Sequence, residues 1–569
     1  MNVNAALGFL ARDVPLDDWD FDGREGGHLN PLRECLLLSN FKEKLAKKQV
    51  IFKINQSVKR RVYGGGILEN QIHWKLRTED LINQVLASLA AGMPDFNDVE
   101  QLSMDKSFVS ALRISNAASA PTLSRFFARF EEKCKHDRMM ALAEVRGELS
   151  RLTKTDPLRI TTPAIMDLID FTENEAIRIL KKRGDKEYFI IDVDSTPVEL
   201  FGNQNEASYD GHYRCISYLP IFVAINGVPA FVQNAPGAAN GAALCLIHIR
   251  RLIQKLRESF PGARILVRGD TGYNNAELIR IIVEEGVSYI LGYNVRPKDL
   301  KAKLFEHIAQ EYAADPTSRI CMAKEILKEI PLTGLFDEVK PPKRRRKLTT
   351  TTAGNKFRCC GFFHNYQAKT WKTPRTVVYR LQFSDQYQEV DARFIQTNLS
   401  IEEARTFAKG RGLRKYRALP DESFERDKVN AEASIEIYEE IFCSRGEDER
   451  LNCEWKSSCC AARCSLNGFF ANSLRMTITL VVMQIMEELR HALLRREQPH
   501  KPLKKRRSRK RNTTRAHCAE KRRYGPTIRL IRQFLICVPA KIRELQTRIV
   551  FGLPPMPEAW QRRFEILME

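Results

Sequence analysis

The sequence lacks the features that mark several large classes of protein. Fourteen cysteines among 569 residues are too few for a disulfide framework. The first residues carry no basic stretch followed by a long apolar segment, so we expect no secretory signal. The longest apolar run near the C-terminus, residues 476–486, is too short to cross a bilayer. These absences predict a soluble cytoplasmic protein with reduced thiols and no membrane partner.

Several common active-site patterns are missing as well. The sequence contains no phosphate-binding loop, no dinucleotide fingerprint and no convincing Ser/His/Asp arrangement. The cysteines between residues 453 and 464 follow a C-x5-C-C-x3-C spacing, without the C-x2-C turn that structural zinc sites favour. We therefore expect Cys453, Cys460 and Cys464 to pack as small apolar side chains rather than to bind zinc.

Acidic residues are in the minority. The chain has 70 of them against 92 lysines and arginines, for a net charge of +22. Residues 501–523 contribute a net +11, and residues 340–347 add six more positive charges. Concentrated positive charge favours phosphate backbones, because binding releases counterions. The excess predicts a nucleic-acid partner, although residues 501–523 alone are also compatible with a solvated tail, an RNA-binding tail or one that binds acidic proteins.

One apolar segment contains two carboxylates that need a partner. Residues 187–198 read EYFIIDVDSTPV, a pattern typical of a buried strand interrupted by Asp192 and Asp194. Side chains of a strand alternate between its faces, so both aspartates point the same way. Burying unpaired carboxylates is costly. The segment therefore predicts a compensating cation beside this strand.

Residues 187–293 alternate between strand and helix patterns. Asn226-Gly227 separates two β-rich runs, which is the strongest short signal for a hairpin. A long amphipathic helix at residues 239–260 follows, and then an apolar strand that ends in Asp270. Another helix and another strand come after it. Three antiparallel strands, a helix and further strands give the order of an α/β ribonuclease-H-like core.

The flanking regions differ in composition from this core. Residues 78–136 favour helices, and the last of these presents Arg125 on a face that could contact DNA, as in a helix-turn-helix. An ordinary helical bundle is the alternative. Residues 300–425 contain β-type runs between segments rich in lysine and proline, which predicts a β-rich insertion. Helix patterns return from about residue 430.

A third acid lies on one of these later helices. Arg445, Glu449 and Lys456 are separated by four and then seven residues, so they share one helical face. Taken alone, this pattern is more typical of a surface helix with ion pairs between neighbouring turns. Glycine is unfavourable inside a helix, and Gly446 directly follows Arg445. The alternative is therefore that Arg445 lies at the start of the helix instead of within it.

The three acids together indicate a metal-binding site more strongly than any one of them alone. Asp194 lies mid-strand, Asp270 at the C-terminal end of a strand, and Glu449 on a helix. Phosphoryl transfer on DNA requires an oxygen nucleophile and a leaving oxygen, and two divalent cations activate the first and stabilise the second. Mg²⁺ prefers oxygen ligands and keeps several waters, so a few carboxylates suffice. We expect Asp194 to bridge two cations, with Asp270 and Glu449 each binding one.

The sequence resembles the bacterial DDE-type insertion-sequence transposases, in the branch with a β-rich insertion before the glutamate. The resemblance covers roughly residues 78–490 and is specific in the combination of its motifs. The matching segments are AGMPDFNDVEQL (91–102), APTLSRF (120–126), DVDST (192–196), LVRGDTGY (266–273), RFIQTNL (393–399) and RGEDERLNCEWK (445–456).

The resemblance implies roles for individual residues. Asp194, Asp270 and Glu449 are expected to be the catalytic triad and metal ligands, for two Mg²⁺ or Mn²⁺ ions. Arg445, Lys456 and Arg125 are expected to bind DNA. Asp192 is expected either to orient the ligands or to act as an alternative ligand.

The chain departs from the family signature at one position. The signature Y-x2-R-x3-E-x6-K has its arginine, glutamate and lysine here, but Phe442 replaces the tyrosine. A hydroxyl that could touch a phosphate is therefore missing, and Tyr438, one helical turn earlier, is a candidate substitute. The departure leaves open whether this copy is active.

The resemblance also implies an activity and partners. The enzyme is expected to bind terminal inverted repeats as a homodimer on paired ends, nick the DNA and join the freed 3′-hydroxyl to target DNA. This would take place in the cytoplasm of a bacterium, at the nucleoid. A metal-dependent nuclease that does not join strands, and a non-catalytic DNA-binding protein derived from a transposase, are the alternatives.

The organisation expected from sequence has five parts. They are an N-terminal helical region that binds DNA ends (1–150), the first part of the ribonuclease-H-like core (151–299), the β-rich insertion (300–425), the second part of the core with Glu449 (426–495) and a basic C-terminal region (496–569).

Overall fold

The computed structural model describes residues 78–103, 117–144, 156–293, 356–367, 371, 373–384, 389–410, 436–496, 526–533, 541–544, 549–552 and 560. The predictions made for residues 1–75 and for the basic segments 340–347 and 501–523 lie outside these described residues.

A mixed eight-stranded sheet forms the centre of the fold, in the order β6-β5-β1-β7-β8-β11-β10-β9. Its strands are β1 Tyr188–Ser195, β5 Ile221–Ile225, β6 Val228–Gln233, β7 Arg264–Gly269, β8 Ser288–Tyr293, β9 Lys356–Tyr366, β10 Arg375–Ser384 and β11 Glu389–Thr397. Strands β6, β5 and β1 pair antiparallel, whereas β7 and β8 run parallel to β1. The predicted mixed α/β class is confirmed for the described residues.

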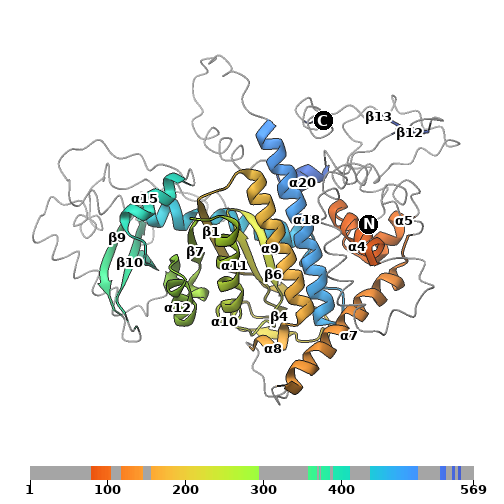
Figure 1. The fold of residues 1–569 in the computed structure, drawn as a ribbon, viewed down its shortest axis with the longest axis horizontal. Coiled ribbons are helices and arrows are strands. Elements are labelled where there is room, and N and C mark those ends of the chain that lie inside the picture. The colour runs from red at the N-terminus through yellow and green to blue at the C-terminus, as the bar shows by residue number, and fades with distance from the viewer. Residues whose placement is uncertain are drawn as a thin grey trace, which may run out of the picture.

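The helices are α4 Thr78–Ala91, α5 Phe96–Ser103, α7 Ala120–Glu144, α8 Pro157–Ile160, α9 Pro163–Arg183, α10 Gly241–Leu244, α11 Leu246–Ser259, α12 Ala276–Glu284, α15 Ile401–Gly410, α17 Gly446–Ser457, α18 Phe469–Arg496 and α20 Ile528–Ile531. The helix expected at residues 239–260 is two helices, α10 and α11, which meet at Cys245. Strands β12 Lys541–Glu544 and β13 Ile549–Gly552 form a separate antiparallel pair. Figure 1 shows α9 and α18 side by side against the sheet.

The hairpin between β5 and β6 follows from its two turn residues. Asn226 and Gly227 have φ angles of 51° and 77°, and two positive φ angles are what a type I′ turn requires. The Asn226 side chain accepts a hydrogen bond from the Ile190 N–H at 2.8 Å and donates one to the Tyr188 carbonyl at 2.9 Å. The turn therefore also fixes β1, the strand that carries the two aspartates.

The two faces of the sheet have separate apolar cores. Phe189, Ile191 and Val193 of β1 face the main core, which also includes side chains of α4, α7, α9, α11, α12 and α18. Ile190 faces a second, smaller core. Because strand side chains alternate, Asp192 and Asp194 lie on the same face as Ile190.

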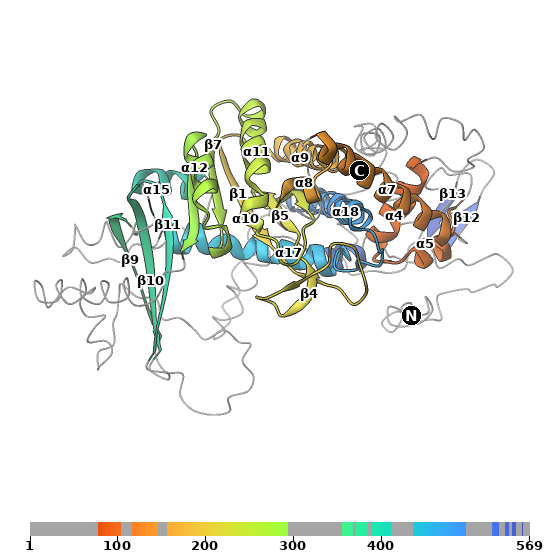
Figure 2. The same cartoon turned by 90° about the horizontal axis from the view of Figure 1, so that it is seen from below.

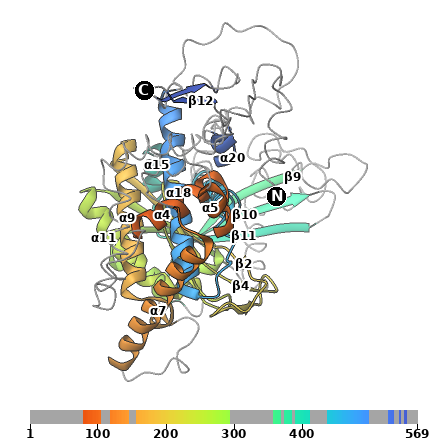
Figure 3. The same ribbon diagram turned by 90° about the vertical axis from the view of Figure 1, so that its right-hand side faces the viewer.

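Helix α18 passes through the main core, in contact with α4, α7 and α9 (Figure 3). Its Phe469–Leu493 segment is long and apolar enough to cross a membrane by length and composition, and thus exceeds the apolar run expected from sequence. The most apolar window of this segment is wholly buried inside the protein. The Gln484 amide donates to the carbonyls of Thr172 and Pro229, at 2.9 Å each. Such internal pairing is what polar groups of a central core helix need.

The β-rich insertion extends the sheet instead of standing apart from it. Strand β11 pairs antiparallel with β8, and β10 and β9 continue outward from it. The second core lies over this region and contains side chains from α15 and from the π-helix Glu436–Phe442. A 3₁₀ turn, Cys443–Arg445, then leads directly into α17. The insertion therefore helps to build the surface from which α17 starts.

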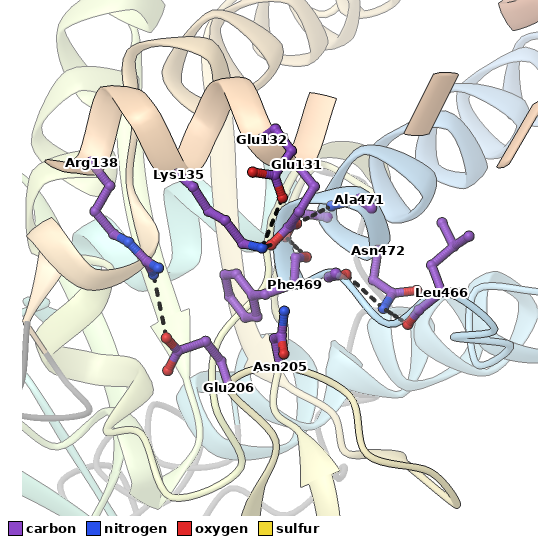
Figure 4. A network of polar contacts seen from close by, with 12 residues as sticks. Glu131, Glu132, Lys135, Arg138, Asn205, Glu206, Leu466, Phe469, Ala471 and Asn472 are labelled. Atoms are coloured by element: carbon purple, nitrogen blue, oxygen red, sulfur yellow. Dashed lines mark hydrogen bonds and ion pairs between the residues drawn. The ribbon is translucent and has the colours of Figure 1, made fainter. Parts of the chain in front are cut away.

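A three-stranded ribbon branches from the sheet after β1. It contains β2 Val198–Glu199, β3 Ser208–Asp210 and β4 Cys215–Tyr218, in the order β2-β4-β3. We call residues 198–218 the ribbon. Figure 4 shows how its Glu206 faces Arg138 of α7, with the two side chains joined at 3.3 Å. Glu206 also pairs with Arg159 at 2.6 Å. These ion pairs fix the base of the ribbon against the helices.

Candidate active site

Asp192 lies in a buried ion pair. Asp192 and Arg268 are direct neighbours across the parallel strands β1 and β7. Both carboxylate oxygens of Asp192 accept hydrogen bonds from Arg268, one of them at 2.7 Å. The two residues are 4% and 3% exposed. This pair accounts for one of the two acids of β1, because an adjacent buried cation neutralises its charge.

Arg268 extends this pair to the segment before α17. Its Nη1 atom donates to the carbonyl of Ile441 and to the hydroxyl of Ser444. Ser444 lies in the 3₁₀ turn that enters α17. The pair therefore ties the centre of the sheet to the start of the helix that carries Glu449.

Asp194 is contacted directly by that helix. One of its oxygens accepts from Arg445 at 3.1 Å, and the other accepts from the Asn452 amide at 2.7 Å. Arg445 is the N-cap residue of α17, so the alternative that placed it at the helix entrance is the one observed. Strand β1 and helix α17, 251 residues apart at this contact, thus meet at one carboxylate.

The pKa of Asp194 is raised to about 6. Burial of the carboxyl is the main cause, and the nearby charge of Asp270 adds to it; Arg445 and the Asn452 hydrogen bond act in the opposite direction. The effect of the Asp270 charge on Asp194 places the two carboxylates near each other. Because burial disfavours the charged form of Asp194, a further cation beside this carboxylate would stabilise it.

Asp270 follows β7 at the edge next to Asp194. Its carboxylate accepts a hydrogen bond from the Gly272 N–H at 2.8 Å and so caps the 3₁₀ turn Thr271–Tyr273. The Tyr273 hydroxyl is 2.5 Å from the Ser195 hydroxyl, which joins this turn to the residue after Asp194.

Gly292 of β8 allows the Asp270 turn to pack this closely. A β-carbon at Gly292 would lie 2.6 Å from the Thr271 nitrogen and 2.9 Å from the Asp270 carbonyl carbon. Because both neighbours are backbone atoms, any side chain at this position would displace the turn. Glycine at 292 therefore sets the position of Asp270.

One face of α17 is directed toward the strand end. Arg445, Glu449, Asn452 and Lys456 follow one another at steps of four, three and four residues, which places them on the same helical face. Arg445 and Asn452 contact Asp194, and the Lys456 ammonium donates to the carbonyl of Pro197 at 3.4 Å. Glu449 lies between these contacts and is exposed. Among the described residues Glu449 forms no hydrogen bond or ion pair, so its carboxylate is open to a ligand.

The structure thus brings together most, but not all, of the residues expected at the site. Asp194, Asp270, Arg445 and Lys456 gather at the ends of β1 and β7, with Glu449 on the facing side of α17. Within the described part of the chain, no three His, Cys, Asp or Glu side chains lie close enough to form a ready metal cluster. The expected convergence of all three acids on shared ions is therefore not seen, and their joint role as ligands stays a prediction.

Two other residues named from the sequence lie apart from this cluster. Arg125 lies on the exposed surface of α7, where its guanidinium is 3.5 Å from the Thr122 hydroxyl. Tyr438 is 2% exposed in the second core, stacks near Phe442 and carries Arg380 over its ring. It is therefore not placed to offer its hydroxyl to a phosphate in place of the tyrosine missing at 442.

Sequence reasoning missed two residues of the site, Asn452 and Arg268. Asn452 shares the helical face of Arg445 and Glu449, and its spacing from Glu449 was available as a signal. Arg268, near the end of β7, stands two residues before Asp270, just as Asp192 stands two residues before Asp194 on β1. The repeated two-residue spacing was visible, but the pairing also required the register between β1 and β7.

The chemistry of these donors fits a hard divalent cation. Asp194, Asp270 and Glu449 offer carboxylate oxygens, the ligands that Mg²⁺ and Mn²⁺ prefer. Both oxygens of Asp194 already hold one hydrogen bond each, and a carboxylate oxygen has a second lone pair for a metal. The raised pKa of Asp194 agrees with a site that favours added positive charge.

Comparison with known proteins adds the family. The family model described as transposase DDE domain group 1 matches residues 67–417, more than half of the chain. This range includes Asp194 and Asp270 and ends before Glu449. A search of curated proteins found no match to this chain.

Two solved assemblies are similar at low sequence identity. A cryo-EM structure of the piggyBac transposase synaptic complex with hairpin DNA has 10% identity and a TM-score of 0.32, and the match covers 80% of this chain and 74% of that chain. A cryo-EM structure of the simian T-cell lymphotropic virus intasome with the PP2A regulatory subunit B56 gamma has 12% identity and a TM-score of 0.12, and covers 37% and 81%. Neither TM-score is high enough to carry an argument, so the family match decides: this chain belongs to the transposases with a DDE domain of group 1.

Proposed function

We propose that the protein is a DNA transposase that binds terminal inverted repeats, cleaves the DNA in a metal-dependent step and joins the freed 3′-hydroxyl to target DNA. The observation that carries this proposal is the meeting of Asp194 and Asp270, at the ends of adjacent parallel strands, with the Arg445–Lys456 face of α17. Two neighbouring acids, one of them with a pKa raised mainly by burial and further by the other acid, form with the two cations a site suited to a phosphodiester and divalent ions.

The strand order supports a ribonuclease-H-like core. Three antiparallel strands, β6, β5 and β1, are followed by β7 and β8, which run parallel to β1. In such open sheets, ligands bind at the carboxyl ends of the parallel strands. Asp194 and Asp270 stand at these ends, so the proposed catalytic position agrees with the topology.

The reaction is a displacement at phosphorus in both steps. In cleavage a water oxygen attacks the phosphorus and a 3′-oxygen leaves. In strand transfer the freed 3′-hydroxyl attacks a phosphorus of the target DNA, and the 3′-oxygen of the target strand leaves. Bound divalent ions, held by Asp194, Asp270 and Glu449, would activate the attacking oxygen and stabilise the leaving one. Arg445 and Lys456 would hold DNA phosphates by their charge. The Asp192–Arg268 pair would keep α17 in place while these groups act.

Cutting two transposon ends together requires two active sites, so we propose a homodimer on paired ends. The reaction would take place in a bacterial cytoplasm, at the nucleoid. The proposals of a homodimer and of a bacterial location are both independent of the geometry of the site within one chain.

A strand-transfer assay tests the function against its nearest rival. A labelled duplex is prepared with the sequence that flanks the gene, where the terminal inverted repeats are expected, and with a free 3′-hydroxyl. It is incubated with plasmid DNA, the full chain and Mg²⁺. Joined products support the transposase, whereas hydrolysis without joining would assign a nuclease. Binding without either reaction would assign a non-catalytic protein, for which the open carboxylate of Glu449 has no use.

The basic segment 501–523 is expected to strengthen DNA binding through its net charge of +11. Deleting it should weaken duplex binding at low salt and flatten the dependence of log K on log salt, by about 0.9 for each phosphate that the segment neutralises in the intact chain. Fluorescence anisotropy between about 50 and 200 mM salt measures both effects. A variant of equal length, with glutamine at every lysine and arginine of the segment, is the matched control and should behave like the deletion. An unchanged slope in both variants would show that this segment does not touch DNA.

A further inference from the structure

The ribbon exposes an unusual share of apolar side chains. Nine large apolar side chains stand exposed among the described residues, and four of them lie between residues 201 and 216. They are Phe201, Tyr209, Tyr213 and Ile216, with exposed fractions of 89%, 59%, 48% and 52%. Single exposed apolar residues are common on protein surfaces, but a cluster of them marks a binding surface.

These side chains are arranged by the pairing of β3 and β4. Tyr209 and Ile216 are direct cross-strand neighbours, so their side chains stand on the same face of the ribbon. At the tip, the Asp210 carboxylate accepts from the N–H groups of His212 and Tyr213, at 2.8 Å and 3.1 Å. The rings of His212 and Tyr213 then meet edge to face, with centroids 4.7 Å apart. The tip is thus held in one conformation with Tyr213 outward.

The base of the ribbon is fixed to the rest of the protein. Glu206 pairs with Arg138 (Figure 4) and with Arg159. The Tyr218 hydroxyl donates to the Asn205 carbonyl at 2.6 Å. A β-carbon at Gly237 would lie 2.5 Å from the Ser208 carbonyl oxygen, so the main chain packs directly against β3. An exposed surface on so rigid a base loses little conformational entropy when it binds a ligand.

The ribbon stands next to the candidate active site. Figure 2 shows it projecting beside α17, and Lys456 of α17 contacts Pro197, the residue before β2. The pKa of the Tyr213 hydroxyl is raised by partial burial and then by the negative charges of Asp194, Asp270 and Asp210. The ribbon starts at the candidate site, because β2 follows Pro197 directly and pairs with β4. His212 and Arg214 are exposed on either side of Tyr213.

We propose that Tyr209, Tyr213 and Ile216 form a stacking platform for unpaired bases of the DNA strand whose phosphate lies at Asp194 and Asp270. The proposal rests on the proposed function, because it needs DNA at that site. Aromatic side chains beside cations are what single-stranded nucleic-acid surfaces use, and stacking accepts any base because every base has a π-face. The continuity with Arg445 and Lys456, and the basic tip at Arg214, favour a nucleic acid over a second protein.

The test uses the full chain and a single-stranded oligothymidylate that carries one 2-aminopurine. Binding is followed by anisotropy, and stacking by quenching of the 2-aminopurine fluorescence. Tyr209→Ala and Tyr213→Ala should each weaken binding by roughly five- to a hundredfold and reduce the quenching. Tyr213→Phe keeps the ring and should behave like the wild type. Ile247→Ala changes an exposed residue of α11 away from the ribbon and serves as the matched control.

Several outcomes would overturn the platform. If Tyr209→Ala and Tyr213→Ala both bind the oligothymidylate with wild-type affinity, these rings do not stack on its bases. A Tyr213→Phe variant as weak as Tyr213→Ala assigns the contact to the hydroxyl instead. A change of oligomeric state in Tyr209→Ala, measured by sedimentation with DNA binding unchanged, assigns the face to a second copy of the chain.

A parallel measurement separates this failure from failure of the proposed function. The wild type is assayed for Mg²⁺-dependent cleavage and joining of duplex DNA. If it cleaves and joins while the alanine variants bind and quench normally, only the platform fails. If it neither binds nor cleaves DNA of any form, the proposed function and the platform fail together.

Discussion

Replacing Glu449 by glutamine is expected to abolish both cleavage and strand transfer while leaving DNA binding nearly intact. The substitution keeps the size of the side chain and removes the charged oxygen donor from the α17 face between Arg445 and Asn452. Glu449 is exposed and makes no ion pair or hydrogen bond with other described residues, so folding should not change. The rate should fall by more than the roughly 10- to 100-fold that substitutions around a metal ligand cost.

The measurement is a strand-transfer assay with Mg²⁺, combined with a binding assay on the same duplex. Glu258→Gln is the matched control, because Glu258 is an exposed glutamate on α11 and undergoes the same chemical change. Its activity should equal that of the wild type. Surviving cleavage in Glu449→Gln would remove this residue from the site and leave Asp194 and Asp270 in need of another partner.

Replacing Asp192 by asparagine is expected to cause the largest loss of stability. Arg268 is 3% exposed and would keep its charge without the carboxylate that neutralises it. Breaking a buried ion pair on one side typically costs about 3–5 kcal/mol, and the amide, which keeps one hydrogen bond, should place this variant at the lower end. Denaturant unfolding of the full chain, or its thermal midpoint, measures the loss.

The double variant Asp192→Asn/Arg268→Met separates stability from positioning. It removes the arginine charge as well, and replacing both members of a buried ion pair by uncharged side chains is often close to neutral. It also removes the hydrogen bonds from Arg268 to Ile441 and Ser444 that hold the entrance of α17. We therefore expect recovered stability with activity still reduced. Recovery of full activity would show that this tether does not position Glu449.

Those parts of the fold that local patterns encode could be predicted from the sequence. The alternation around Asp192 and Asp194, and the Asn226-Gly227 turn, depend only on neighbours in the chain, and both occur as expected. Spacing on a helix is equally local, which is why Arg445, Glu449 and Lys456 share a face. The family match then agreed with the motifs that first suggested a transposase.

The parts that depend on distant pairing could not be predicted. Strand β11 joins β8 although about a hundred residues separate them, and no local pattern states that partnership. The bond between Asp192 and Arg268 needs the register of β1 against β7. Asn452 looked like an ordinary polar residue until Asp194 was placed opposite it. The two acids of β1 therefore have different roles. Arg268 pairs with Asp192, and only Asp194 faces the proposed site.

The 251 residues between Asp194 and Arg445 have a consequence during protein synthesis. A ribosome completes β1 and β7 long before it reaches α17, so the emerging chain lacks the arginine, the lysine and Glu449 throughout most of translation. Prematurely terminated products would carry both aspartates without the helix that completes the proposed site. The order of segments along the polypeptide thus delays assembly of the proposed active site until α17 has been synthesised.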